Sequence, residues 1–187
     1  MVETADGIVA KQLLCESIVN PLGIDADPPR LSWQFAEAGR GQHQTAYRVI
    51  AASSAEALER GEADLWDSGK VESERSIHVP YAGRALVSGQ RCFWKVRAWD
   101  AEGLEGPWSA PGGFEMGLLE ESDWEGGWIA DPDAETGEDR PAPFFRRELR
   151  IEKEVVSARV YICGLGYHEL YVNGEKVGDH VLDPGFT

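Results

Sequence analysis

Basic residues are scarce in this chain of 187 residues. Only 18 Lys and Arg stand against 33 Asp and Glu, which gives a formal net charge of −15. Proteins that bind phosphate backbones or anionic membranes need clustered Lys and Arg to meet that negative charge. The composition therefore argues against a nucleic-acid partner and against a membrane partner.

Cysteine and long apolar runs are also scarce. Cys15, Cys92 and Cys163 are an odd number, lie far apart and form no C-x-x-C pair, which argues against a disulfide framework or a zinc site. No run approaches the roughly 20 apolar residues of a membrane-spanning helix. The N-terminal stretch lacks the basic start and apolar core of a secretion signal. We expect a reduced, soluble, cytoplasmic protein without a cofactor.

Two patterns bear weakly on metal binding. Asp131, Asp133 and Glu135 are spaced like the start of a calcium loop, but Pro132 interrupts the pattern and Ala142 replaces the bidentate glutamate. His168 and His180 could meet across a hairpin, yet no neighbouring Cys or carboxylate has a supporting spacing. We predict no metal site.

Alternating apolar residues are the strongest structural pattern present. In Arg91–Trp99, Cys92, Trp94, Val96 and Ala98 alternate with Phe93, Lys95, Arg97 and Trp99, which is typical of a half-buried strand. A turn follows, and Pro107–Ser109 is expected to open a second, short strand. The pattern predicts a central strand of a β-sandwich.

Similar short apolar runs recur every ten to fifteen residues or so before this strand, separated by Gly, Pro, Asp or Ser. Between two of them, Ser53–Gly61 predicts a single helical turn with Ser53 or Ser54 as N-cap and Gly61 as its end. About seven short strands in about 100 residues favour an immunoglobulin-like or fibronectin type III-like sandwich, which we place at 1–118.

A second all-β region follows an acidic linker at 119–130 and is assigned to 124–187. Alternation predicts strands at Phe144–Ile151 and Ala158–Ile162, and Asn173-Gly174 between apolar runs predicts a hairpin. The sequence stops without a closing strand. We therefore expect a partial, truncated β-sandwich whose open strand edges are covered either by the first domain or by a second copy of the chain in a homodimer.

Several motifs taken together resemble the N-terminal region of bacterial α-L-rhamnosidases, glycoside hydrolase family 78. They are Leu14-Cys15-Glu16, Asn20–Asp25, Pro29–Trp33, Leu65–Val71, Trp94–Asp100, Phe114–Leu119, Trp128-Ile129, Gly166–Gly174, Gly178-Asp179 and Asp183–Gly185. The resemblance implies a fibronectin-like domain, then a jelly roll of carbohydrate-binding type, then a helical toroid that carries the catalytic acids. The toroid lies beyond this sequence, so the resemblance implies a non-catalytic segment without catalytic residues of its own.

Two functions remain open at this stage. The segment could be a structural docking platform for the catalytic toroid of the same polypeptide, in an enzyme of carbohydrate metabolism that hydrolyses terminal α-L-rhamnosides. Alternatively, it could bind rhamnose-containing glycosides through exposed aromatic rings. The candidates for sugar binding are Trp99, Trp108, Trp124 and Tyr167; the competing interpretation is that these rings pack in the cores or at the seam between domains.

Overall fold

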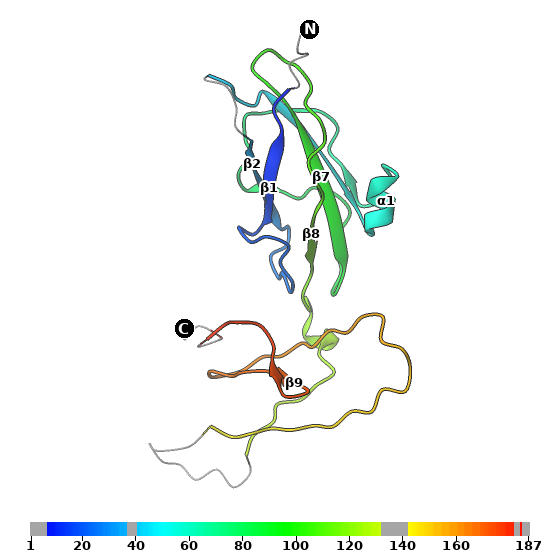
Figure 1. The fold of residues 1–187 in the computed structure, drawn as a ribbon, viewed down its shortest axis with the longest axis vertical. Coiled ribbons are helices and arrows are strands. Elements are labelled where there is room, and N and C mark those ends of the chain that lie inside the picture. The colour runs from blue at the N-terminus through cyan, green and yellow to red at the C-terminus, as the bar shows by residue number, and fades with distance from the viewer. Residues whose placement is uncertain (1–6, 37–40, 132–141, 182–183, 185–187) are drawn as a thin grey trace. The chain divides into compact units, whose positions relative to one another are not determined.

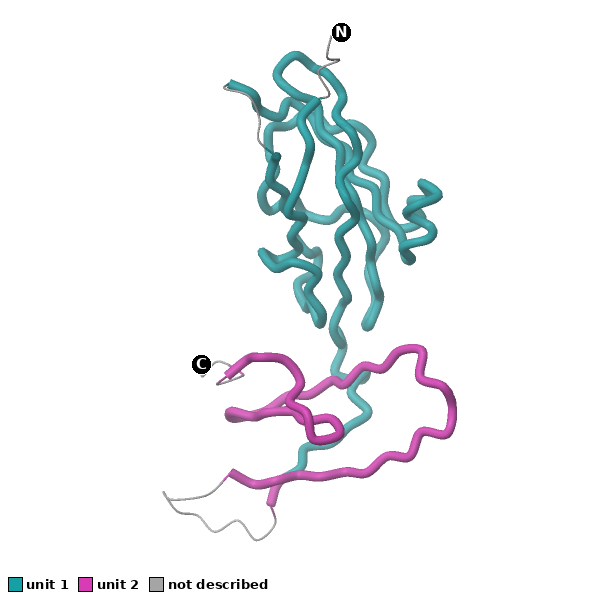
Figure 2. The backbone as a smooth tube through the Cα atoms, viewed as in Figure 1, with its two compact units in different colours: residues 1–129 teal, residues 130–187 magenta. Residues whose placement is uncertain are grey.

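The computed structural model describes residues 7–36, 41–131, 142–181 and 184. The chain divides into two compact units, 1–129 and 130–187 (Figure 2), and each is described by itself. Apart from one short helix and one 3-10 turn, the described elements are strands (Figure 1). The predicted all-β class is confirmed.

The first unit is built from two antiparallel sheets. One has the strand order β1-β2-β6 and the other the order β4-β3-β7-β8, with β5 also paired to β3. The strands are β1 (Ala10–Cys15), β2 (Arg30–Phe35), β3 (Ala46–Ala52), β4 (Trp66–Asp67), β5 (Val71–Glu72), β6 (Val79–Pro80), β7 (Arg91–Trp99) and β8 (Gly112–Glu115). The main core cluster takes side chains from both sheets, among them Trp33 and Trp94. This is the arrangement of an immunoglobulin-like sandwich.

Strand β7 is the central strand that the alternation predicts. It pairs with β3 from Ala46↔Trp99 to Ala52↔Phe93, and with β8 on its other side. Cys92, Trp94, Val96 and Ala98 are all buried in the core. The inward face is confirmed, since Cys92, Trp94 and Val96 belong to the main core cluster that both sheets share.

The helical turn is also confirmed. Helix α1 (Ala55–Glu59) has Ser54 as its N-cap, whose hydroxyl accepts a hydrogen bond from the Ala57 N–H. Gly61 follows the helix with φ of +76°, a conformation that glycine adopts without steric cost. Ala57 and Leu58 pack against Ile50 and Ala52, so α1 covers part of the outer face of the larger sheet.

The strand expected at Pro107–Ser109 is wrong. These residues have no strand assignment, although the Ser109 N–H donates to the Val96 carbonyl at 2.8 Å and the Ser109 hydroxyl accepts from the Val96 N–H at 3.1 Å. Pro107 has no N–H to continue a ladder, and the Ser109 side chain takes over one backbone contact. The next strand, β8, starts three residues later.

In the second unit, the hairpin is confirmed. Strands β9 (Tyr171–Val172) and β10 (Glu175–Lys176) pair around Asn173 and Gly174, whose φ angles are +53° and +87°. The strands expected at Phe144–Ile151 and Ala158–Ile162 are wrong, since these residues carry no strand assignment. A strand needs a hydrogen-bonded neighbour as well as alternation, and the described part of this unit supplies none to them.

Candidate functional site

Trp99 is the most buried of the four aromatic residues considered for sugar binding. It ends β7 on the outer face of the larger sheet, but it is only 8% exposed. The Lys70 ammonium lies 5.0 Å from the centre of its ring. Because a sugar stacks on an open aromatic face, Trp99 offers no platform in this structure.

Trp108 lies against the small cluster under α1 and is partly buried. The Arg97 guanidinium lies 4.0 Å from the centre of its ring and the Lys95 ammonium 5.3 Å away. Arg97 also forms an ion pair with Glu105, and burial, with the nearby charge of Arg48, lowers the pKa of Arg97. Arg97 and Lys95 already cover the ring of Trp108, so a sugar would have to displace these cations before it could stack there.

Trp124 and Tyr167 are more open, at 42% and 54% exposed. Trp124 follows the 3-10 turn of the first unit, whereas Tyr167 precedes the hairpin of the second. The structure thus places Trp124 in the first unit and Tyr167 in the second. Sugar binding at Trp124 and Tyr167 stays a prediction.

A contact that the sequence did not indicate holds the end of the first unit in place. After β8, the 3-10 turn η1 (Glu121–Asp123) brings the Asp123 carboxylate to the Ser88 hydroxyl, which donates to it. The same hydroxyl accepts from the Leu119 N–H at 2.8 Å. We call these two residues the Ser88–Asp123 latch. It ties the segment leaving the sandwich to the loop before β7, across 35 positions that no local pattern connects.

Removing the latch should loosen this segment. The Ser88 hydroxyl, together with the Glu120 N–H, holds the pKa of Asp123 below its ordinary value of 3.8. The latch therefore contributes fully above that value and is lost as the pH falls through the depressed pKa. We expect Asp123→Ala to speed amide exchange at Leu119, measured by NMR, while Glu121→Ala on the same turn leaves it unchanged. Equal exchange in both variants would show that the latch holds nothing.

Reactive or metal-binding groups are few in the part of the chain that the structure describes. It holds no group of three His, Cys, Asp or Glu side chains that could bind a metal ion. Asp133 and Glu135 of the possible calcium loop lie outside the described residues. Burial raises the pKa of the Cys15 thiol to about 12, and it also raises the pKa of Cys92. These two thiols are therefore poor nucleophiles. In the same described residues, no helix has the length and hydropathy of a bilayer span.

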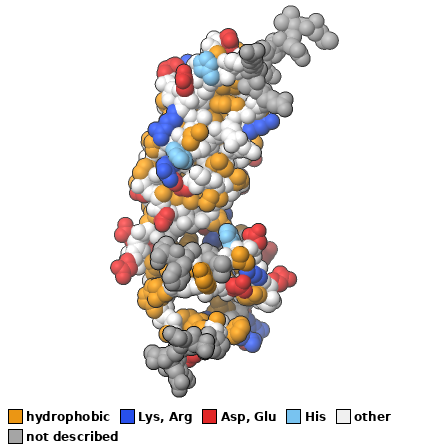
Figure 3. All heavy atoms as spheres, turned by 90° about the vertical axis from the view of Figure 1, so that its left-hand side faces the viewer, with side chains coloured by type: hydrophobic (Ala, Val, Ile, Leu, Met, Phe, Trp, Pro, Cys, Tyr) orange, Lys and Arg blue, Asp and Glu red, His pale blue; other side chains and the backbone are white. Residues whose placement is uncertain are grey.

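The second unit exposes much apolar surface. Phe144, Val156 and Leu165 are 102%, 95% and 88% exposed, and Figure 3 shows hydrophobic side chains scattered among acidic and basic ones on the face that it draws. Large apolar side chains that are exposed to this degree are typical of a surface that another part of a protein covers.

The fold thus defines the first unit as an immunoglobulin-like sandwich module, followed by a β unit with uncovered apolar side chains. The family model of the Rha78A-like N-terminal immunoglobulin domain matches residues 10–120, more than half of the chain. The α-L-rhamnosidase N-terminal domain matches residues 153–187. The chain belongs to the family of Rha78A-like N-terminal immunoglobulin domains, and the resemblance to α-L-rhamnosidases is confirmed.

Relatives support the same assignment. An α-L-rhamnosidase of Formosa agariphila is 42% identical over 92% of this chain and 20% of its own length. The α-L-rhamnosidase structure from Dictyoglumus thermophilum is 39% identical, with a TM-score of 0.85 over 97% of this chain and 22% of that one. The Streptomyces avermitilis α-L-rhamnosidase, solved in complex with L-rhamnose, is 47% identical, with a TM-score of 0.63 over 67% of this chain and 12% of that one. The chain therefore spans about a fifth of the length of the curated relatives that it matches.

Proposed function

We propose that this chain is the N-terminal, non-catalytic module of an α-L-rhamnosidase that hydrolyses terminal α-L-rhamnosides. In this proposal it docks onto the helical-toroid catalytic domain of the same polypeptide. The exposed apolar side chains of the second unit carry the proposal, with Val156 at 95% and Leu165 at 88% exposed. When another protein surface covers such side chains, apolar area leaves water and the free energy of the assembly falls.

The first unit complements this role. Its sandwich is closed around a core that includes Trp33 and Trp94, both 1% exposed, so it can hold its own structure. The Ser88–Asp123 latch stiffens the segment that leads out of it. A rigid module with a fixed exit is suited to supporting a neighbouring domain.

A chimera tests docking directly. This chain would replace the matched fifth of the Dictyoglumus thermophilum enzyme, whose corresponding region has a TM-score of 0.85 to it. We expect the chimera to release 4-nitrophenol from 4-nitrophenyl α-L-rhamnoside, whereas this chain alone releases none. Val156→Asp with Leu165→Asp should lower the melting temperature and the activity of the chimera, because charges replace apolar contacts.

The control is Val87→Asp, which places one such charge at a side chain of the first unit that is 63% exposed. It should leave both readouts unchanged. If the double variant were as stable and active as the control, the second unit would not be the docking surface.

The alternative is a sugar-binding module, and the open rings of Trp124 and Tyr167 favour it. Titration of the chain with rhamnosyl flavonoid glycosides separates the two functions. Saturable binding that Trp124→Ala or Tyr167→Ala removes would support the alternative. The cytoplasmic location and a homodimer through open strand edges remain predictions.

A further inference from the structure

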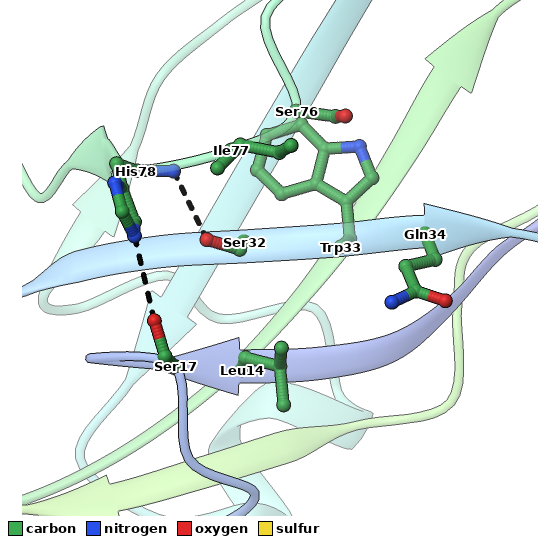
Figure 4. Close-up of a pocket in the computed structure, with 8 residues that line it drawn as sticks. All are labelled: Leu14, Ser17, Ser32, Trp33, Gln34, Ser76, Ile77 and His78. Atoms are coloured by element: carbon green, nitrogen blue, oxygen red, sulfur yellow. Dashed lines mark hydrogen bonds between the residues drawn. The ribbon is translucent and has the colours of Figure 1, made fainter.

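A hollow lies on the outer face of the smaller sheet of the first unit (Figure 4). Its volume is about 260 Å³, and its lining comes from β1 and the turn after it, from β2 and from the segment that precedes β6. The residues are Leu14, Ser17, Ser32, Trp33, Gln34, Ser76, Ile77 and His78. Leu14 and Ser32 are register partners, so they share the face of the pleat that points away from the core.

Buried Gln44, which is 3% exposed, holds segments next to the hollow in place. Its amide donates to the carbonyls of Ser73 and Arg75 at 2.8 and 3.0 Å, and its oxygen accepts from the Trp33 indole N–H at 3.0 Å. In addition, the backbone N–H of Trp33 donates to the Ser76 carbonyl at 2.9 Å. A rim held by the core keeps its shape without a ligand, which lowers the entropic cost of binding.

The polar groups of the hollow suit hydroxyl ligands. The Ser17 hydroxyl and His78 Nε2 face each other at a long 3.4 Å, and Ser32 Oγ accepts from the His78 N–H at 3.0 Å (Figure 4). Within the described residues, the side chain of Gln34 has no hydrogen-bond partner of its own. Hydroxyl, amide and imidazole groups each both donate and accept, as the hydroxyls of a sugar require.

The charges and the apolar surface of the hollow limit further which ligands it can bind. Among the residues that the structure describes, no Lys, Arg, Asp or Glu lines the hollow, and the nearby Glu16 and Arg30 neutralise each other in a bidentate ion pair. The lining therefore favours a neutral ligand over a phosphate or an amine. Leu14 and Ile77, the latter 64% exposed, lie on opposite sides of β2 and each add apolar surface to the hollow (Figure 4).

We propose that this hollow binds a single neutral 6-deoxyhexose such as L-rhamnose, with its hydroxyls toward Ser17, Gln34 and His78 and its methyl toward Ile77. The volume is below the ~300–1,000 Å³ of sites for drug-sized ligands, so one ring fits and a long oligosaccharide does not. The choice of rhamnose rests on the proposed function; the chemistry of the hollow itself does not. A shallow site without an open aromatic ring binds weakly, with a Kd of about 1–10 mM.

The test is an NMR titration of this chain with L-rhamnose and with L-mannose, which differs only by a hydroxyl on the sixth carbon. L-rhamnose should shift the amide resonances of Ser17, Ser32, Ile77 and His78, and L-mannose should bind more weakly. Gln34→Ala should raise the Kd at least about fivefold because a hydrogen-bond partner is lost. Ile77→Asp should weaken L-rhamnose more than L-mannose, while Trp124→Ala should change neither.

Three results would overturn this proposal. They are no shift up to about 50 mM sugar, shifts confined to the surroundings of Trp124 and Tyr167, or equal binding of the two sugars in every variant. The chimera experiment probes the second unit, whereas this titration reports on the smaller sheet of the first. Either proposal can therefore fail without the other.

Discussion

Trp33→Ala is expected to cost the first unit about 3–5 kcal/mol of its free energy of unfolding. Trp33 is 1% exposed, and its ring meets that of Tyr47 edge to face with centroids 5.2 Å apart. Its indole N–H also satisfies buried Gln44, which holds the carbonyls of Ser73 and Arg75. The truncation leaves both a cavity and an unpaired buried acceptor. Their combined cost approaches the whole free energy of unfolding of a small domain.

Urea unfolding followed by near-ultraviolet circular dichroism measures this loss. Trp33→Phe separates the two causes, since it keeps most of the ring but removes the N–H; we expect it to cost about 1–3 kcal/mol. The matched control is Trp128→Ala, because Trp128 is 71% exposed. A loss below about 1 kcal/mol for Trp33→Ala would mean that this tryptophan is not a centre of the core.

Amide exchange in this chain alone should differ more than about a thousandfold between its two units. The amides of β3 and β7 pair along seven residue positions inside the sandwich, so they open only when the unit unfolds. In the second unit, the described strands are β9 and β10, and a two-stranded hairpin by itself is marginally stable in water. Residues 144–162 should therefore exchange near the rate of an unstructured chain.

Hydrogen exchange followed by mass spectrometry gives both rates in one experiment. In the chimera with the relative's catalytic domain, residues 144–162 should become protected while β3 and β7 stay as they were. Protection of 144–162 in the isolated chain that rises with protein concentration would favour the homodimer instead. Protection equal to that of β7 at every concentration would contradict the view that this surface lacks a partner.

Local patterns in the sequence predicted several elements correctly. The alternation in Arg91–Trp99 predicted the inward face of β7. The pair Ser53-Ser54 and Gly61 marked the two ends of α1, and the structure selects Ser54 as the N-cap. Asn173-Gly174 marked the hairpin because both residues need a positive φ. In each case the physical cause acts within a few residues, so the sequence alone contains it.

Other features depend on partners that are distant along the chain. The alternation of Phe144–Ile151 equals that of a strand, yet no neighbouring strand pairs with it among the described residues. Trp99 points away from the core but is covered by Lys70. Asp123, in the turn that follows β8, contacts Ser88, which precedes β7. Spacing along the sequence carries no information about such contacts.

The sequence by itself determined the β class of the first unit, the faces of its central strand, its turns and its kinship with α-L-rhamnosidases. Only the tertiary structure decided which aromatic rings stay open, how the exit segment is tied down and where a hollow lies on the smaller sheet. Faces and turns follow from backbone geometry and side-chain burial over neighbouring residues. Exposure and hollows follow from which segments pack together, and that is fixed by the folded chain as a whole.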